Sequence, residues 1–370
     1  MRVRYALVGA GMMGQEHIRN IALLADAELV AFAEPDAGMR EAAQVLAPQA
    51  RAFARHEDLL AAGVPFDAVV LASPNHTHAA ILEDLIGAGR PILAEKPVVV
   101  DLREAARIEA RAAQAGVPIW VAMEYRYMPA VSTLIEDLAA GRAGRLRMIS
   151  IVERRFPFLR KVGDWNRFNR TTGGTLVEKC CHFFDLMRLL AQAEPVSVHA
   201  VGGQALNHLD ESYADGVPDV LDHAYVTVTF ADGVKAMLEL CMFAEGSRFQ
   251  ERVSVIGERA TLEARVPGPG RFEADGRDKE AEYAIADRAT RIETTTIVPV
   301  DPALLAAGDH HGSTFHQHRL FNAMVREGGA PAVALRDGVL AVAMGLAAQD
   351  SIATGRPVAM AEILARAGQG

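Results

Sequence analysis

A glutamate and a histidine stand four residues apart in an apolar stretch of the chain, and both side chains can handle protons. The apolar spacing from Leu176 to Leu190 predicts one buried helix that carries Glu178 and His182. Side chains four residues apart on a helix lie on one face, one above the other. Imidazole has an ordinary pKa of about 6.5, so His182 suits a general base, and Glu178 could orient it or bind a substrate hydroxyl. The alternative is that both residues, with Asp185, form a satisfied polar seam in the core.

Lys96 is a second residue whose position suits chemistry. Residues 92–94 form a short apolar run that predicts a buried strand, and Glu95, Lys96 and Pro97 follow it directly. In an open parallel sheet, ligands bind at the carboxyl ends of the strands. Lys96 would then stand beside a bound cofactor as a fixed cation and proton donor. The alternative is a surface lysine at the end of a strand.

Metal-binding residue types are present, but their spacing does not favour a metal site. Cys180, Cys181 and His182 are consecutive on the predicted helix, where neighbouring side chains point about 100° apart, so zinc ligation is not expected. A second group of histidines is more typical of loop and helix-start positions: His310, His311, His316 and His318. We therefore predict no metal site.

A glycine-rich turn near the start of the chain indicates a dinucleotide site. Residues 3–8 predict a strand, Gly9, Gly11 and Gly14 complete a G-x-G-x-x-G motif, and helical spacing follows to Leu24. The first glycine permits the tight turn, the second lets the backbone approach a pyrophosphate, and the third lets the helix pack on the strand. The helix start then offers unpaired N–H groups to the phosphates.

The next predicted strand, residues 28–33, ends at Glu34, twenty residues after Gly14. A carboxylate there can accept hydrogen bonds from the ribose hydroxyls and would repel a 2′-phosphate. NAD is therefore favoured over NADP. Arg40 lies six residues further on and could pair with a 2′-phosphate, which keeps NADP as the less favoured alternative.

Strands and helices go on alternating to about residue 122, which indicates an α/β domain with a doubly wound parallel sheet. The loop after the strand at residues 68–71 also leaves the carboxyl edge, so Asn75 could contact a cofactor there, while Asn75 and Thr77 could cap the following helix. His76 and His78 are expected to serve packing and capping. The full set of residues expected at the cofactor is Gly9, Gly11, Met12, Met13, Gly14, Glu34, Ser73, Asn75, His78, Glu95 and Lys96.

Beyond residue 123 the pattern changes to alternation of polar and apolar residues, as in the stretches 145–152, 197–201, 224–230 and 235–242. This indicates a second, α+β domain over residues 123–370 with a mostly antiparallel, open sheet and one face in water. The polar segment 266–300 predicts a long loop or hairpin, and helices are expected at 314–326 and 337–353. The first domain then spans residues 1–122, and two domains suit a chain of 370 residues.

The composition narrows the class of protein. A net charge of -9 argues against a nucleic-acid binder, which needs clustered cations. The chain contains no run of about 18 apolar residues, so no membrane span is expected. Three cysteines, two of them adjacent, cannot make a disulfide framework, which fits the reducing cytoplasm.

Taken together, these residues resemble the glucose-fructose oxidoreductase, inositol dehydrogenase and rhizopine-catabolism family, called Gfo/Idh/MocA. The resemblance covers nearly the whole chain, and the order and spacing of its motifs make it specific. They are Gly9 to Gly14, Ser73 to His78, Glu95-Lys96-Pro97, Tyr125 to Pro129, Gly173 to Asp185, and Asp337-Gly338 to Val358.

The resemblance implies substrate held between a Rossmann domain and an α/β domain whose open sheet forms a homodimer or homotetramer. It also implies catalysis by the Lys96 of Glu-Lys-Pro and by an Asp-x-x-x-His pair, matched here by Glu178 and His182. Glutamate replaces the family aspartate and is one methylene longer. The implied reaction oxidises a secondary hydroxyl of a cyclic polyol or sugar. The substrate contacts it suggests are Lys96, Arg126, Tyr127, Trp165, Asn169, Glu178, His182 and His311.

Two other functions fit the same family. One is a redox-neutral enzyme, in which tightly held NAD oxidises and later reduces a sugar during glycoside cleavage or epimerisation. The other is a non-catalytic NAD-binding regulator. Lys96 and His182 argue against a regulator, because a sensor needs no pair of proton-transfer groups.

Overall fold

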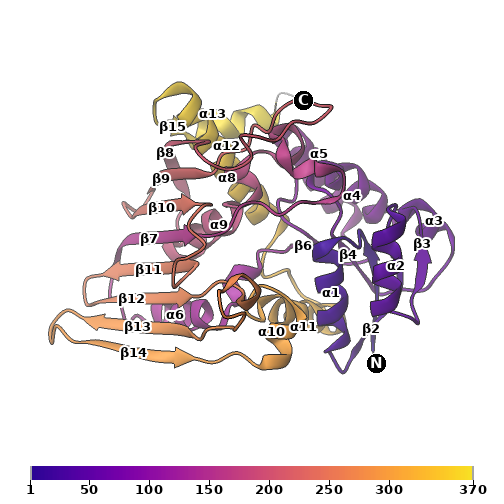
Figure 1. The fold of residues 1–370 in the computed structure, drawn as a ribbon, viewed down its shortest axis with the longest axis horizontal. Coiled ribbons are helices and arrows are strands. Elements are labelled where there is room, and N and C mark those ends of the chain that lie inside the picture. Colours follow the sequence, from indigo (N-terminus) through magenta and orange to yellow (C-terminus); the bar gives the residue numbers. More distant parts are fainter. Residues whose placement is uncertain (1, 369–370) are drawn as a thin grey trace.

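The computed structural model describes residues 2–368, which form two sheets with helices between and around them (Figure 1). The first sheet has six strands in the order β3-β2-β1-β4-β5-β6, and every neighbouring pair is parallel. Its strands are β1 Val3–Val8, β2 Ala27–Ala33, β3 Arg51–Phe53, β4 Ala68–Leu71, β5 Ile92–Ala94 and β6 Ile119–Val121. The predicted doubly wound parallel sheet is confirmed.

Helices join these strands in alternation, as the sequence pattern predicts. They are α1 Met12–Ala22, α2 Ala37–Leu46, α3 His56–Ala61, α4 His78–Gly87 and α5 Leu102–Ala115. The strands β1, β4, β5 and β6 are buried almost throughout, because helices cover both faces of a parallel sheet, whereas the edge strand β3 is partly exposed. The short helix α3 was not predicted, since six residues carry too little periodicity to stand out.

The second sheet has nine strands in the order β14-β13-β12-β11-β7-β10-β9-β8-β15. All of its neighbouring pairs are antiparallel except β7 with β10, so the predicted mostly antiparallel sheet is confirmed. Its strands are β7 Leu146–Arg154, β8 Pro195–Gly203, β9 His223–Phe230, β10 Lys235–Cys241, β11 Glu251–Gly257, β12 Ala260–Val266, β13 Ala281–Asp287, β14 Glu293–Val298 and β15 Val358–Ala359.

Alternating burial along these strands leaves one face of the second sheet to the helices and the other exposed. The helices of this half are α6 Pro129–Ala139, α7 Asn169–Thr172, α8 Thr175–Glu178, α9 Cys181–Ala191, α10 Pro302–Ala307, α11 Ser313–Glu327, α12 Leu335–Thr354 and α13 Met360–Leu364. Of these, α11 and α12 match the two predicted closing helices closely.

The end of the chain returns to the first sheet and fixes the two halves against each other. The backbone N–H of Val121 in β6 donates to the Val333 carbonyl at 3.0 Å. On α11, Asn322 Oδ1 accepts from the Tyr5 hydroxyl of β1 at 3.1 Å, with both side chains buried. The space between the sheets is therefore framed by elements from both ends of the chain.

Two parts of the second half differ from the prediction, and one agrees with it. The polar segment 266–300 contains the hairpin of β13 and β14 after a loop, as predicted, whereas the strands β11 and β12 were missed. The predicted single helix from Leu176 to Leu190 is two helices, because α8 ends at Glu178 and α9 begins at Cys181. The carbonyl of Glu178 accepts a hydrogen bond from Lys96 Nζ at 3.1 Å at this break.

Within residues 2–368, no helix has both the length and the apolar character that a membrane crossing requires.

A buried ion pair links the segment after β6 to α9 and generates a stability prediction. Arg126 donates through Nε and Nη2 to the Asp185 carboxylate, and the two side chains are 10% and 0% exposed. Asp185→Asn leaves the guanidinium buried without its counter-charge, so we expect urea denaturation to show a loss of about 3 kcal/mol in unfolding free energy.

The matched control is Glu258→Gln, which removes a carboxylate from a surface pair with Arg147 and should leave the urea midpoint unchanged. Equal midpoints for Asp185→Asn and the unsubstituted protein would contradict the prediction.

Candidate functional site

The three glycines of the first turn have the geometry that a dinucleotide loop requires. Gly9 has φ +89°, a conformation that L side chains rarely adopt. A Cβ at Gly14 would lie 2.2 Å from the Gly9 carbonyl oxygen, so only glycine lets α1 pack this closely on β1. A Cβ at Gly11 would meet no heavy atom within 4 Å among the described residues. The backbone is thus open where a pyrophosphate would approach the start of α1.

Glu34 lies at the end of β2 and faces this loop. Its Oε2 accepts a hydrogen bond from the Ala10 N–H at 2.7 Å, and its Oε1 accepts from the Asp36 N–H at 2.9 Å. Arg40 Nη1 donates to the Glu34 carbonyl at 2.7 Å and to the Pro35 carbonyl at 3.1 Å. The carboxylate is therefore placed beside the dinucleotide loop, while the arginine is bound to backbone. The exposed Met12 and half-buried Met13 open α1.

The loop after β4 connects the first half to the second. Asn75 Nδ2 donates to Glu178 Oε2 and to the Thr172 carbonyl, so Asn75 does not cap α4. Thr77 precedes α4 without a side-chain cap, because its hydroxyl donates to the Pro74 carbonyl and lies 2.7 Å from Ser73 Oγ. The capping role predicted for Asn75 and Thr77 is wrong, since both side chains have other partners.

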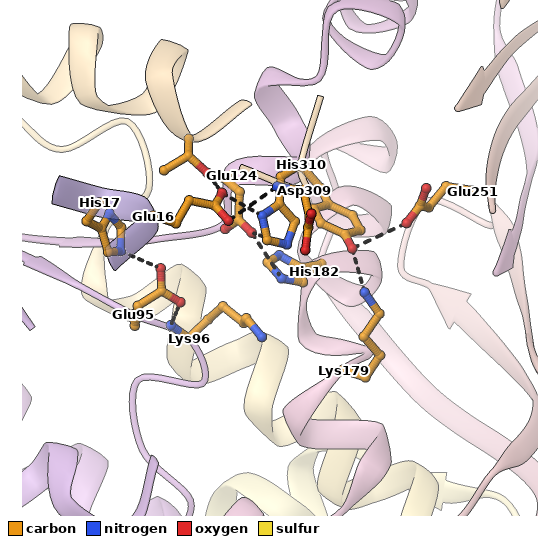
Figure 2. Close-up of polar contacts among 12 residues, drawn as sticks. Glu16, His17, Glu95, Lys96, Glu124, Lys179, His182, Glu251, Asp309 and His310 are labelled. Atoms are coloured by element: carbon orange, nitrogen blue, oxygen red, sulfur yellow. Dashed lines mark hydrogen bonds and ion pairs between the residues drawn. The ribbon is translucent and has the colours of Figure 1, made fainter. Parts of the chain in front are cut away.

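Lys96 follows β5 and reaches toward the start of α9, where Figure 2 shows its side chain pointing toward His182. Burial alone would lower the pKa of Lys96, but Glu178, Cys181, Glu95 and Glu124 outweigh it and raise the pKa. The ammonium is therefore held in its charged form. Its neighbour Glu95 accepts from His17 Nε2 at 3.0 Å and from the Lys96 N–H at 3.2 Å, which turns its carboxylate toward α1.

Glu178 is surrounded by donors rather than by a histidine. Its Oε1 lies 3.4 Å from Lys161 Nζ, and its Oε2 accepts from Asn75. Burial would raise the pKa of Glu178, but Lys161, Lys96 and the Asn75 hydrogen bond lower it on balance. Glu178 is thus an ionised carboxylate close to two lysines. Its side chain is directed away from the His182 imidazole, which the sequence spacing had predicted as its partner.

His182 is buried against an aromatic ring. Its imidazole stacks on the Tyr125 ring with centroids 4.1 Å apart and planes 5° apart. Its Nε2 lies 3.6 Å from Glu124 Oε1, and its buried Nδ1 has no hydrogen-bond partner among the described residues. Burial and the positive charges of Lys96 and Lys179 hold the pKa of His182 well below its usual value. The ring is therefore neutral and able to accept a proton.

Glu124 and His310 extend this group toward α1 (Figure 2). His310 Nδ1 donates to Glu16 Oε1 at 2.8 Å, and its Nε2 lies 3.9 Å from Glu124 Oε1. Burial would lower the pKa of His310, but Glu16 and Glu124 raise it to about 9. Burial and Glu95 raise the pKa of Glu124 to about 7.

A second buried network supports the ring beneath His182. Lys179 Nζ donates to the Tyr125 hydroxyl and lies 2.8 Å from Glu153 Oε1. The same hydroxyl donates to Glu251 Oε1 at 3.3 Å. The Tyr125 ring is thus held at its far end by charged groups, and its face is fixed against the His182 imidazole.

The structure brings Lys96, Glu178 and His182 together, but it gives several other candidate residues different partners. Arg126 is paired with Asp185, and the half-buried Tyr127 packs against Trp120 with ring centroids 6.4 Å apart. The remaining placements are as follows: Asn169 binds Asp219, His311 Nε2 binds the Pro267 carbonyl at 2.7 Å, and the buried His78 lies between the Ser73 and Pro97 carbonyls. Direct ligand contact by these residues stays a prediction.

Trp165 does lie beside the site, because Lys161 Nζ sits 4.4 Å from its ring centroid while pairing with Glu178. Four residues that the sequence did not single out belong to the same group: Glu16, Glu124, Lys161 and Lys179. The sequence could have indicated Glu124 as a site residue, because it follows the carboxyl end of strand β6 as Lys96 follows that of β5. No group of three or more potential metal ligands lies together within residues 2–368.

Comparison with protein families covers most of the chain. Residues 3–123 match the model of an oxidoreductase family with an NAD-binding Rossmann fold. Residues 135–360 match the model of the C-terminal alpha/beta domain of the same oxidoreductase family, GFO_IDH_MocA. The glycine turn and the free start of α1 are the parts of this structure that fit an NAD pyrophosphate.

Individual relatives agree with this assignment. The inositol 2-dehydrogenase of Rhizobium meliloti strain 1021 is 26% identical, over 98% of this chain and 100% of its own. Among solved structures, a myo-inositol dehydrogenase from Corynebacterium glutamicum matches with a TM-score of 0.76 at 22% identity, covering 97% of this chain and 99% of that one. A levoglucosan dehydrogenase in complex with NADH and levoglucosan matches with a TM-score of 0.80 at 21% identity, covering 97% and 100%. The chain belongs to the Gfo/Idh/MocA oxidoreductase family and carries that family's NAD-binding Rossmann domain.

Proposed function

We propose that this protein is an NAD-dependent dehydrogenase that oxidises a secondary hydroxyl of a cyclic polyol or sugar. The single observation that carries the proposal is the meeting of a charged Lys96 and a neutral, buried His182 at the carboxyl edge of the NAD-binding sheet. The relatives named inositol dehydrogenase and levoglucosan dehydrogenase support the class of substrate.

The two side chains have complementary roles in this proposal. His182 accepts the hydroxyl proton, because its neutral imidazole has a free nitrogen. Lys96 donates a hydrogen bond to the same oxygen and stabilises the negative charge that develops there. NAD, when bound, supplies the acceptor for the hydride. Glu178 holds two lysines in place, because its carboxylate pairs with Lys161 and its carbonyl accepts a hydrogen bond from Lys96.

Glu34 supports NAD as the preferred coenzyme. Its carboxylate lies beside the glycine turn, where ribose hydroxyls are expected and a 2′-phosphate would be repelled. Arg40, the residue that could have favoured NADP, donates to two backbone carbonyls.

Lys96→Ala should lower turnover by about two orders of magnitude, because the developing oxyanion loses its charged donor. The measurement is absorbance of reduced nicotinamide with a panel of inositols, aldoses and glycosides. NAD affinity, measured by isothermal titration calorimetry, should change little.

Lys235→Ala is the matched control, because Lys235 is an exposed lysine on β10 and should leave turnover unchanged. Near-normal turnover of the Lys96→Ala protein would remove Lys96 from the mechanism. Tightly bound NAD without net reduction by any substrate would favour the redox-neutral enzyme instead.

Glu34→Gln should lower the preference for NAD over NADP about tenfold or more, because a close negative charge no longer opposes the 2′-phosphate. The amide keeps an oxygen that can still accept from the Ala10 N–H. The ratio of kcat/KM for the two coenzymes measures the effect. Glu28→Gln, an exposed carboxylate on the same strand, is the control, and an equal ratio for both variants would contradict the ribose assignment.

The exposed face of the second sheet supports self-association into a homodimer or homotetramer. Val201 and Tyr225 are register partners on neighbouring strands and are 56% and 54% exposed, which is high for large apolar side chains. Tyr225→Arg should shift the mass measured by light scattering toward that of a single chain. Val45→Arg on α2 is the control, and an unchanged mass for the Tyr225 variant would argue against this face.

The three thiols of the described residues are all free, which supports a reducing compartment, and we propose the cytoplasm.

A further inference from the structure

One carboxylate in the site has no hydrogen bond to account for its burial. Glu124 is 1% exposed, and neither of its carboxylate oxygens has a hydrogen-bond partner among the described residues. Leaving a buried carboxylate unsatisfied is costly, so such a group calls for a functional explanation. Its Oε1 lies between two imidazoles, 3.6 Å from His182 Nε2 and 3.9 Å from His310 Nε2.

The carboxylate expected to serve His182 is engaged elsewhere. Glu178 Oε1 pairs with Lys161, Glu178 Oε2 accepts from Asn75, and the Glu178 carbonyl accepts from Lys96. No contact between the Glu178 carboxylate and the His182 ring is present among the described residues. The imidazole faces Glu124 instead, which lies in the 3-10 turn η2, Glu124–Tyr127, directly after β6.

From this geometry we propose that Glu124, and not Glu178, receives the substrate proton from His182. This inference rests on the dehydrogenase function proposed above and adds Glu124 to it as a second proton-handling group after His182. The hydride carries both electrons of the broken C–H bond, so the hydroxyl proton is all that the protein must accept. It moves from the substrate oxygen to His182, and the Nε2–H bond of the imidazolium then breaks as an O–H bond forms on Glu124.

The charges around His182 give this second transfer its direction. An imidazolium there would face the positive Lys96, Lys179, Arg155 and His310, which is why the pKa of His182 lies well below its usual value. A carboxylate within 4 Å is the nearest group that can relieve that repulsion. The proton therefore leaves the ring soon after it arrives.

The charges around Glu124 keep it ready to accept. Burial and Glu95 raise its pKa to about 7, against the lowering effect of His310 and Lys96. His310 is in turn held positive by Glu16, whose pKa is lowered to about 2 by His310, the Thr314 hydroxyl and His17 against the opposing effect of burial. Near neutral pH, Glu124 can thus both take up and release a proton.

The path ends at water on the side of His310. His182 and Glu124 side chains are each 2% exposed, whereas the His310 side chain is 22% exposed. His310 releases its Nε2 proton to water, and Glu124 then returns one proton to the vacated nitrogen. Glu124 and His310 then carry the protons that they had at the start. His182 keeps its new proton on Nδ1, and it returns to the Nε2–H tautomer by proton exchange with water before the next turnover.

Glu124→Gln tests the relay, because the amide keeps the size of the side chain but cannot accept a proton. We expect kcat/KM for polyol oxidation at pH 8 to fall about 100-fold. In the unsubstituted protein, kcat/KM should rise about tenfold from pH 6 to pH 8 as Glu124 ionises, and this limb should vanish in the variant.

Glu251→Gln is the matched control, because Glu251 is the other buried carboxylate of this region whose pKa is raised to about 7. It faces the Tyr125 hydroxyl rather than His182, so its variant should keep the limb. The relay would be overturned if kcat/KM still rose from pH 6 to pH 8 in Glu124→Gln, or if this rise were lost only in Glu251→Gln. Either result would leave the dehydrogenase function intact. Failure of the unsubstituted protein to reduce nicotinamide with any polyol or sugar would overturn both.

A substrate-free measurement separates electrostatic coupling from mere packing. NMR titration of the histidine rings should show a lower pKa for His310 in Glu124→Gln than in the unsubstituted protein, because one of the two carboxylates that raise it is gone. If Glu124 were an uncharged, purely structural group, its replacement by Gln would remove no charge, so an unchanged His310 titration would overturn the inference as well.

Discussion

The positive charge of the buried Lys96 ammonium must be balanced by negative groups, and this requirement determines which residues meet between the two sheets. A lysine at the end of β5 that reaches between domains loses water, and that loss disfavours its charge. Carboxylates from three separate segments, Glu95, Glu124 and Glu178, reverse the effect, and the end of α8 adds a carbonyl oxygen. Because these groups come from both halves, holding Lys96 charged also fixes the α8 and α9 region against the Rossmann sheet.

The same charge explains the form of the neighbouring groups. The interruption between α8 and α9 places the Glu178 carbonyl where Lys96 can bind it, which an uninterrupted helix would direct to its own backbone. Burial, together with the positive charges of Lys96 and Lys179, keeps His182 neutral. The imidazole is therefore in the form that can accept a proton.

Much of this fold follows from local sequence, whereas most of the site does not. The glycine turn, the buried strands and the helix α1 that follows the turn could be predicted, because short-range periodicity and turn residues determine them. The strands β11 and β12 were missed, since their identity depends on pairing with β7 and β13 across the sheet. Glu124 and His310 are 186 positions apart in the sequence, and no local pattern announces that they meet.

Glu178 illustrates the limit of spacing as an argument. A separation of four residues places two Cβ atoms on one face of a helix. The direction of a buried carboxylate, however, depends on the strongest hydrogen-bond donors within its reach. For Glu178 those donors are Lys161 and Asn75, from a loop and from the Rossmann domain. Within residues 2–368, Glu124 is the buried carboxylate for which both oxygens lack a hydrogen-bond donor, and it is the one that faces the His182 imidazole. In a buried site that contains several charges, the pairing of any two groups depends on all the others. The partner of one residue can therefore be identified only when all of its charged neighbours are known.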